Sequence, residues 1–369
     1  MAHVVSTQIQ TGLPLQYSGL TQDQWLPRIR AAKQTLGRDL LILGHHYQRD
    51  DVIQFSDLTG DSFKLARMAS KESAAEYVVF CGVHFMAETA DILTSAQQKV
   101  ILPDLNAGCS MADMADIEQV QDCWEEISSV LPGTTIPITY VNSTASLKAF
   151  CGMHGGAVCT SSNAKRVLTW ALEQGQRVLF FPDEHLGRNT AMNLGLKPKN
   201  LVVYNQLKGE LEWLPGQQPD DVKVVLWKGF CSVHQRFNTK QIEALREQHP
   251  DIKVLVHPES SHDVVAMSDL SGSTEFIIQQ IESAPPGSKW AIGTEINLVH
   301  RLAKAHPEQS IVSLNPIVCP CSTMNRIAPE HLLWVLENLV QGEVVNQITV
   351  PKEVAEDAKL ALDRMLTIA

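Results

Sequence analysis

The chain has 369 residues, of which 44% are apolar and 19% charged, so it has ample material for a buried core and is not a disordered chain. Its 30 Lys and Arg stand against 41 Asp and Glu, and the formal charge of −11 argues against a broad nucleic-acid-binding surface. No apolar run approaches the roughly 20 residues of a membrane span, and the polar N-terminus lacks the basic and apolar regions of a secretory signal. These features predict a globular, cytoplasmic protein.

After about twenty polar residues, short apolar runs alternate with amphipathic stretches along the chain. A helix is expected over residues 21–37, with Thr21 as its N-cap. Ten runs rich in Val, Ile and Leu are typical of parallel strands that are buried on both faces. They cover residues 40–47, 77–85, 99–104, 136–142, 157–162, 177–183, 223–231, 252–258, 289–295 and 310–316. The alternation predicts βαβ units in a three-layer α/β architecture.

A weak threefold repeat runs through these elements. Three strands end in the similar signatures HHYQ, YVNST and HPES, and each is followed by a segment with small polar residues and then by a third strand. Cys109 follows the third strand of its repeat directly, whereas Cys231 and Cys319 follow an additional strand. The repeat predicts three pseudo-symmetric αβα domains with short parallel sheets around a central active site.

The repeat also predicts where the domains begin and end. Residues 1–38 form an N-terminal extension and helix, and residues 39–115 form domain 1, on which the C-terminal helices of residues 326–369 are expected to pack. Domain 2 covers residues 116–235 and domain 3 covers residues 236–325. Each domain then has about 100 residues, at the small end of the usual range.

Polar side chains stand at the ends of the first strand of each repeat. Ligands bind at the carboxyl ends of parallel strands, where His45, Tyr140 and His257 lie. Each residue could simply close its own strand, but three of them in register favour a shared site. His46, Tyr47 and Glu259 are further acid–base candidates, because histidine titrates near neutral pH and burial tunes a glutamate.

Small hydroxyl residues precede three helical patterns. Ser62, Ser161 and Thr274 stand at expected helix starts, where free backbone N–H groups and the positive end of the helix dipole attract anions. Ordinary N-capping is the alternative for each of them. Three such positions near three strand ends suggest a small ligand with several anionic groups.

The eight cysteines divide into loop residues and core residues. Cys109, Cys231 and Cys319 lie in loops at strand ends, and in a reduced chain they are candidate metal ligands. The other group is read as packing residues: Cys81, Cys123, Cys151 and Cys159. Three thiolates suit a 4Fe–4S cluster with one open iron that acts as a Lewis acid. Spacing alone leaves the cluster, a zinc ion and core packing open. A Cys–Pro pair is familiar at cluster sites and favours Cys319 over Cys321.

Twelve motifs together resemble the quinolinate synthase family over nearly the whole chain, from about Leu40 to the helix after Asn325. The motifs are GHHYQ, GDSFKLAR, FCGVHFMAETA, PDLNAGCSMAD, TYVNST, CTSSNA, FPDEHLGRNTA, WKGFCSVH, HPES, GSTEFI, GTE and CPCSTMN. The resemblance implies three α/β domains around one active site and a 4Fe–4S cluster. It further implies the condensation of iminoaspartate with dihydroxyacetone phosphate to quinolinate, phosphate and water, in NAD biosynthesis.

The resemblance also implies residue roles. The cluster ligands are Cys109, Cys231 and Cys319. The substrate-binding residues are His45, Ser62, Tyr140, Val141, Asn142, Ser161, His234, His257, Pro258, Glu259 and Thr274. The catalytic residues are His45, Tyr47, Tyr140, His257 and Glu259, with His257 and Glu259 acting as a pair.

Two other functions are weighed against this one. The chain could be a non-catalytic iron–sulfur sensor that binds a dicarboxylate, or a zinc enzyme such as an aldolase. For the enzyme, the expected partners are the two substrates and, by a functional link, an L-aspartate oxidase that supplies the imine. No nucleic acid and no membrane is expected.

Overall fold

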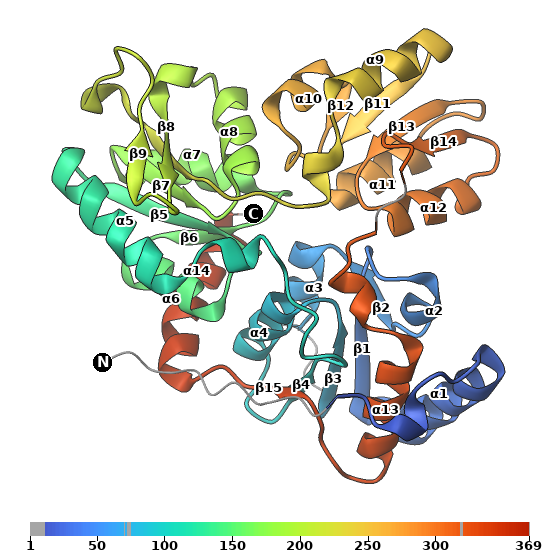
Figure 1. Cartoon of the computed structure of the whole chain (residues 1–369). Helices are drawn as coiled ribbons and strands as arrows, with labels where there is room; N and C mark the ends of the chain where they lie inside the picture. The colour runs from blue at the N-terminus through green and yellow to red at the C-terminus, as the bar shows by residue number, and fades with distance from the viewer. Residues whose placement is uncertain (1–11, 70, 72–74, 318–319, 369) are drawn as a thin grey trace. The chain divides into compact units, whose positions relative to one another are not determined.

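The computed structural model describes residues 12–69, 71, 75–317 and 320–368. The chain forms two compact units, which are called unit 1 (Met1–Cys109 and Cys321–Ala355) and unit 2 (Ser110–Pro320 and Glu356–Ala369). Unit 1 holds one β-sheet and unit 2 holds two (Figure 1). Cys319 lies outside the described residues. Within the described ranges, no helix combines the length and apolar content needed to cross a membrane.

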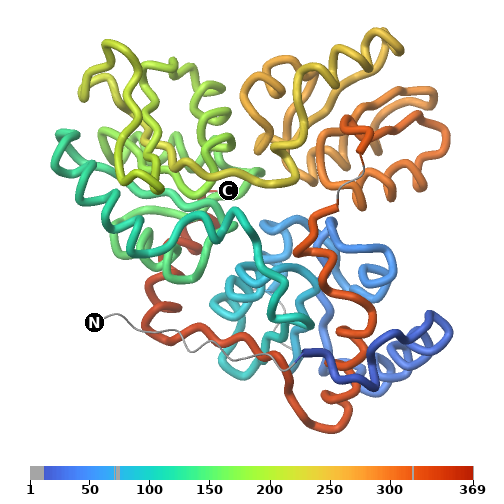
Figure 2. The backbone as a smooth tube through the Cα atoms, viewed as in Figure 1, coloured from blue at the N-terminus to red at the C-terminus, as the bar shows by residue number. Residues whose placement is uncertain are grey.

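The sheet of unit 1 has five strands in the order β15-β4-β3-β1-β2. The strands are β1 (Leu40–His45), β2 (Leu58–Gly60), β3 (Tyr77–Cys81), β4 (Lys99–Ile101) and β15 (Gln347–Ile348). The backbone trace shows β15, which comes from near the C-terminus, beside β4 (Figure 2), and these two strands are antiparallel.

Helices cover both faces of this sheet (Figure 1). On one side lie α3 (Ser62–Ala69) and α4 (His84–Leu93), and on the other lie α1 (Gln22–Leu36), α2 (Asp50–Ile53) and α13 (Pro329–Val340). The expected helix over residues 21–37 is confirmed, and the backbone N–H of Thr21 donates to Gln24 Oε1 at 2.8 Å. An ion pair of 2.7 Å between Arg28 and Glu337 joins α1 to α13.

The first sheet of unit 2 has six strands in the order β6-β5-β7-β10-β8-β9. The strands are β5 (Thr135–Tyr140), β6 (Ala157–Cys159), β7 (Arg177–Phe181), β8 (Leu201–Asn205), β9 (Glu210–Glu212) and β10 (Val224–Trp227). The helices are α5 (Ile117–Val130), α6 (Ala145–Met153), α7 (Ala164–Gln174) and α8 (Glu184–Asn193). All residues of β7 and β10 are buried, as expected for central strands of a covered sheet.

The second sheet of unit 2 has four parallel strands in the order β12-β11-β13-β14. The strands are β11 (Lys253–Val256), β12 (Leu270–Ser271), β13 (Lys289–Gly293) and β14 (Ser310–Ser313). Helices α9 (Thr239–Gln248) and α10 (His262–Met267) lie on one side, and α11 (Thr274–Glu282) and α12 (Ile296–Ala305) lie on the other (Figure 1). Ile242, Val254 and Val264 form part of the buried core between α9, α10 and the sheet.

The same four-stranded parallel core recurs in all three sheets. When the four strands of each core are numbered in chain order, their spatial order across the sheet is 2-1-3-4. The three cores are β2-β1-β3-β4, β6-β5-β7-β10 and β12-β11-β13-β14. The predicted α/β class with three helix-covered sheets is therefore confirmed. The sheets are not purely parallel, however, because β9 and β15 add antiparallel edges. β9 follows β8 after a short connection, which permits only antiparallel pairing.

The sequence-based alignment of the repeat is wrong in its first copy. It overlooked β2, a three-residue strand between Asp57 and Asp61 that has no apolar run. With β2 included, the KVI segment of β4 is the fourth strand of its sheet. Cys109, Cys231 and Cys319 then all follow a fourth strand in the sequence, so the three copies agree better than the sequence pattern indicated.

The C-terminal helices do not all belong to the same unit. Helix α13 lies in unit 1, but α14 (Lys352–Ile368) ends in unit 2. There Arg364 donates to the carbonyl of Gly156 at 2.6 Å, and the carbonyl of Met365 accepts from Asn163 at 3.3 Å. This differs from the expectation that all of residues 326–369 pack on domain 1. The boundaries at residues 115, 235 and 325 remain a prediction.

Replacing Gly152 with alanine is expected to destabilise the docking of α14. A methyl group at this position of α6 would lie 1.9 Å from the carbonyl oxygen of Asp357, so the two helix backbones would have to separate. Overpacking of this kind lowers the free energy of unfolding by about 1–3 kcal/mol, whereas the higher helix propensity of alanine over glycine raises it by about 1 kcal/mol. Thermal unfolding measures the loss, with Gly12→Ala as control because a methyl group added there would meet no other described residue within 4 Å, its chain neighbours aside. An unchanged or higher midpoint for Gly152→Ala would contradict the close approach.

Candidate active site

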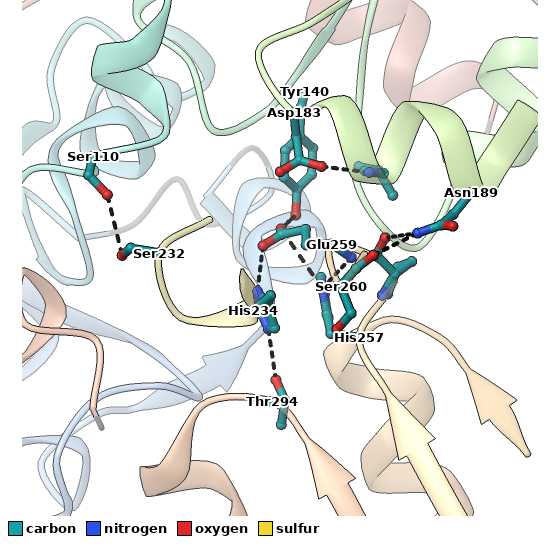
Figure 3. A network of polar contacts seen from close by, with 12 residues as sticks. Ser110, Tyr140, Asp183, Asn189, Ser232, His234, His257, Glu259, Ser260 and Thr294 are labelled. Carbon is teal, nitrogen blue, oxygen red and sulfur yellow. Dashed lines mark hydrogen bonds and ion pairs between the residues drawn. The ribbon is translucent and has the colours of Figure 1, made fainter. Parts of the chain in front are cut away.

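A buried carboxylate network joins the two sheets of unit 2 (Figure 3). Tyr140 is the last residue of β5, and its Oη donates to Oε1 of Glu259 at 2.5 Å. His234 follows β10, and its Nδ1 lies 2.7 Å from Oε2 of the same carboxylate. The three side chains are at most 5% exposed, so each oxygen of Glu259 has a buried hydrogen-bond partner. The carboxylate thus connects two titratable groups that are shielded from water.

The charge of Glu259 determines the tautomer of His234. Burial raises the pKa of Glu259, but the adjacent His257 and His234 rings and the hydrogen bonds from His234 and Tyr140 outweigh burial, so the pKa is lowered. A charged carboxylate only accepts hydrogen bonds, and Nδ1 of His234 therefore carries the hydrogen. Its Nε2 lies 3.4 Å from Oγ1 of Thr294. A continuous line of polar contacts runs from Thr294 through His234 and Glu259 to Tyr140.

His257 lies beside this line rather than in it. Its ring stacks on that of His234 with a centroid distance of 4.5 Å and an interplanar angle of 19°. Burial lowers the pKa of His257 to about 3, against the raising effect of Glu259, so the ring is neutral. Its Nδ1 accepts from the backbone N–H of Glu259 at 3.4 Å and lies 3.9 Å from the carboxylate. Tyr140 and His234 therefore hold the Glu259 carboxylate, and His257, the partner expected from the sequence, lies farther from it.

Three further predicted substrate residues of unit 2 lie at polar or open positions. Oδ1 of Asn142, just after β5, is buried without a hydrogen-bond partner among the described residues, and such an atom calls for a ligand or water. Ser161 and Pro258 line a cavity of about 430 Å³. Val141, in contrast, is a buried residue whose backbone N–H donates to the Cys159 carbonyl at 2.8 Å.

Simple N-capping does not account for the three hydroxyl residues at helix starts. Thr274 is the first residue of α11, but the cap is Ser273, whose Oγ accepts from the Phe276 N–H at 3.3 Å. Ser161 lies ahead of Asn163, which precedes the first residue of α7. Ser62 begins α3 in unit 1, where Asp61 accepts from the Lys64 N–H.

The remaining predicted residues of unit 1 form a small group of their own. His45 ends β1 and is buried. The backbone N–H of Tyr47 donates to Nδ1 of His45 at 3.1 Å, and the two rings meet edge-on at a centroid distance of 4.8 Å. His45 ends and Tyr47 follows the first strand of their sheet, just as Tyr140 ends the first strand of its sheet and Glu259 follows the first strand of the other.

Burial separates the described cysteines into two groups. Cys81, Cys123, Cys151 and Cys159 are buried. Burial raises the pKa of all four thiols, to about 12 for Cys81, so none of them readily forms the thiolate that binds metals. Cys109, Cys231 and Cys321 are partly exposed. The thiol of Cys321 lies 3.4 Å from Oγ1 of Thr323.

One cysteine stands next to the carboxylate network. The ligand atoms of Cys231, His234 and Glu259 all lie within 4.8 Å of one another, so this group could hold a metal ion. Thiolate, imidazole and carboxylate are zinc ligands, whereas an iron–sulfur cluster takes thiolates. The geometry in unit 2 therefore admits a metal at Cys231.

The sequence pattern missed several residues around the network. Asp183, Asn189, Thr294 and His262 contact or surround it in unit 2, and none was singled out (Figure 3 labels the first three). Asp183 and Asn189 lie in the FPDEHLGRNTA motif, which carried the resemblance but no residue role. His234 was found only through the resemblance.

The protein is expected to lose stability as the pH rises, and replacing Asp183 with asparagine is expected to make this decrease smaller. Burial raises the pKa of Asp183 well above its usual value, and the charge of Glu259 raises it further. A raised folded-state pKa favours folding at low pH, and this contribution disappears as the pH rises through that pKa. Asparagine can still accept from the Leu186 N–H as an N-cap, but does not titrate.

Unfolding midpoints of both proteins at several pH values between about 5 and 8 test this expectation. The midpoint of the wild type should decline more steeply with rising pH than that of Asp183→Asn. Asp220→Asn, at an exposed position, should follow the wild type. Parallel profiles for the wild type and Asp183→Asn would contradict it.

Comparison with known proteins supports the family resemblance that the motifs indicated. The family model NadA, described as quinolinate synthetase A protein, matches residues 27–367. A protein of Bacillus anthracis (strain CDC 684 / NRRL 3495) named quinolinate synthase is 55% identical over 358 residues, which cover 97% of each chain. Proteins of the same name from Geobacillus thermodenitrificans (strain NG80-2) and Anoxybacillus flavithermus (strain DSM 21510 / WK1) are 57% and 56% identical, again over 97% of each chain. With this identity along nearly its full length, the chain belongs to the quinolinate synthase family.

Proposed function

We propose that the chain is a quinolinate synthase that condenses iminoaspartate with dihydroxyacetone phosphate to form quinolinate, phosphate and water. The observation that carries the proposal is the Glu259 carboxylate, which is buried and hydrogen-bonded on one oxygen to Tyr140 and on the other to His234. Carbon–carbon bond formation, triose isomerisation and loss of water all need protons moved at defined atoms. Membership of the quinolinate synthase family supports this choice of substrates.

In this proposal Tyr140 is the group that exchanges a proton with the substrate. When its Oη gives up a proton, a proton that enters at Nε2 of His234 allows the Nδ1 hydrogen to move to Glu259, 2.7 Å away, and Glu259 passes it on to Oη at 2.5 Å. In the reverse direction the same atoms remove a proton. His257 has a low pKa and stays neutral, so we assign it to binding through its Nε2–H rather than to carrying charge.

The anionic groups of the substrates would be held at helix starts. Iminoaspartate has two carboxylates and the triose has a phosphate, and helix N-termini bind such groups. Ser62, Ser161 and Thr274 are the proposed contacts, because neighbouring residues already stand at the cap positions of their helices. Oδ1 of Asn142 is available to accept from an imine or hydroxyl hydrogen. The remaining proposed substrate contacts are His45, Tyr47, Val141 and Pro258.

Three cysteines are proposed to hold a 4Fe–4S cluster: Cys109, Cys231 and Cys319. The donor chemistry fits, because Cys109 and Cys231 are partly exposed thiols, whereas burial raises the pKa of the four core cysteines. When bound through three thiolates, such a cluster keeps one iron open as a Lewis acid for substrate oxygens. The group of Cys231, His234 and Glu259 favours a single zinc ion as the second candidate.

Anaerobic incubation with iminoaspartate and dihydroxyacetone phosphate tests the proposal. An enzyme makes quinolinate and releases phosphate, whereas a dicarboxylate sensor binds without turnover. Iron and sulfide analysis of the same preparation separates the cluster from zinc. A folded, iron-loaded protein that forms no quinolinate would rule the proposed function out. The functional link to an L-aspartate oxidase and the cytoplasmic location remain proposals from the sequence.

A further inference from the structure

The loop that carries Glu259 is held to helix α8 by the side chain of Asn189 (Figure 3). Asn189 lies in the middle of α8 and is 7% exposed. Its Nδ2 donates to the Pro258 carbonyl at 2.9 Å and to the Ser260 carbonyl at 2.8 Å. These two carbonyls belong to the residues on either side of Glu259. One amide therefore fixes the backbone before and after the catalytic carboxylate.

The orientation of this amide follows from its partners. Carbonyl oxygens only accept hydrogen bonds, so the nitrogen of the amide must face Pro258 and Ser260, and both of its hydrogens are used. Its Oδ1 then accepts from Nδ1 of His262, which begins α10, at 2.9 Å. Asn189 thus makes three hydrogen bonds to the segment between β11 and the first turn of α10.

Helix α8 is a rigid platform for this side chain. Asp183 caps its first turn through the Leu186 N–H, and the Glu184 N–H donates to the Gly229 carbonyl at 2.9 Å. Gly187 lets the helix lie close to the sheet, since a methyl group there would be 2.6 Å from Leu226. The position of Asn189 is therefore fixed relative to β10 of the sheet that also carries Tyr140.

The Glu259 loop has little backbone bonding of its own. Pro258 has no N–H to donate. The Ser260 N–H donates to the His257 carbonyl at 3.0 Å, and the Glu259 N–H reaches only the His257 ring at 3.4 Å. Without Asn189, the Pro258 and Ser260 carbonyls would lose these partners, and buried polar groups without partners are costly.

We propose that Asn189 is a positioning residue, whose amide clamps the Pro258–Ser260 loop so that the Glu259 carboxylate meets both Tyr140 and His234. Tyr140 belongs to one sheet of unit 2 and Glu259 follows a strand of the other, so the clamp sets the distance across which the proton moves. The inference rests on the proposed function for its kinetic effect, but the clamp itself has a readout that needs no activity.

Kinetics of the iron-loaded enzyme give the first test. Asn189→Ala should lower kcat per mole of cluster by about 100-fold, the effect of misplacing a catalytic group by about 1 Å, with little change in KM. His262→Ala should lower kcat less, because both bonds from Asn189 to the loop remain. Asn200→Asp is the matched control, because it removes an amide-to-carbonyl hydrogen bond of 2.9 Å to Asp221 elsewhere in unit 2.

Asn189→Asp gives a second test, because the aspartate side chain has nearly the same shape as that of asparagine. A charged carboxylate would face the Pro258 and Ser260 carbonyls without a hydrogen to donate, whereas its protonated form can donate once. Its kcat relative to wild type should therefore rise as the pH falls from about 8 toward 6, a range that a buried carboxyl can reach. Three titratable groups face this position: His262, which bonds to the side chain; Lys165, which lines the same cavity; and Glu259, which lies between the two bonded carbonyls. Asn200→Asp should show no such trend.

Hydrogen–deuterium exchange tests the clamp independently of turnover. Backbone amides of residues 257–261 should exchange at least about tenfold faster in Asn189→Ala than in wild type or Asn200→Asp, because local opening exposes them. Unchanged exchange in that segment, or a kcat within twofold of wild type, would overturn the inference. A raised KM with unchanged kcat would do so too, by making Asn189 a substrate contact. If the wild type makes no quinolinate while the exchange effect is present, the proposed function fails and the clamp stands.

Discussion

Cys231→Ser is expected to leave a folded protein without the proposed iron–sulfur cluster and without quinolinate formation. Serine replaces a soft thiolate by a hydroxyl that stays protonated near neutral pH, and iron–sulfur clusters are held by thiolates. Loss of one of the three proposed ligands should abolish the brown cluster absorbance together with bound iron and sulfide, and activity should fall below detection. The same loss is expected for Cys109→Ser and Cys319→Ser.

Cys321→Ser is the matched control for these variants. Cys321 is also partly exposed, and its thiol lies 3.4 Å from Oγ1 of Thr323, a contact that a serine hydroxyl can keep. It should retain cluster absorbance and turnover. If Cys231→Ser kept iron, sulfide and activity, the ligand assignment would be wrong. If Cys321→Ser lost the cluster and Cys319→Ser did not, the third ligand would be Cys321.

Glu259→Gln is expected to lower kcat by about 100- to 10,000-fold, the usual contribution of a positioned acid–base group. The carboxamide has nearly the same shape, but it has only one acceptor oxygen. It cannot accept from Tyr140 and from Nδ1 of His234 together, as the carboxylate does at 2.5 and 2.7 Å. Because a carboxamide neither protonates nor ionises near neutral pH, it cannot pass a proton on, and the line from His234 to Tyr140 is also interrupted.

Metal analysis of Glu259→Gln separates two explanations of its low activity. A cluster on three cysteines does not involve Glu259, so iron and sulfide content should equal that of the wild type. A zinc ion bound by Cys231, His234 and Glu259 would instead be lost or weakened. Glu243→Gln, at an exposed position of α9, controls for the substitution itself. A folded, cluster-loaded Glu259→Gln with full turnover would remove Glu259 from the chemistry.

Much of the fold could be read from local patterns. The ten apolar runs all contain strands of the structure, because a strand buried on both faces needs a continuous run of Val, Ile and Leu. β8 has such a run, LVVYN, and should have been recognised. β2, β9, β12 and β15 are edge strands of two or three residues with exposed or half-exposed positions, so they carry no comparable pattern.

The candidate site could be predicted residue by residue but not as a geometry. The motifs identified Tyr140, His234 and Glu259, yet the sequence pattern paired Glu259 with His257, its near neighbour in the chain. In the structure the partners of Glu259 are 119 and 25 residues away. Asn189 gave no signal of its own, because an asparagine within a helix is most often a solvated residue.

The sequence by itself determined the α/β class, the repeat, the family and the residue types available for acid–base chemistry and metal binding. These depend on composition, periodicity and short motifs, which are local properties of the chain. Only the tertiary structure decided that Tyr140, His234 and Asn189 meet the Glu259 loop and that burial raises the pKa of the core cysteines. The physical reason is that hydrogen bonds and desolvation act between groups brought together by the packing of separate sheets, and the spacing of residues along the chain does not encode that packing directly.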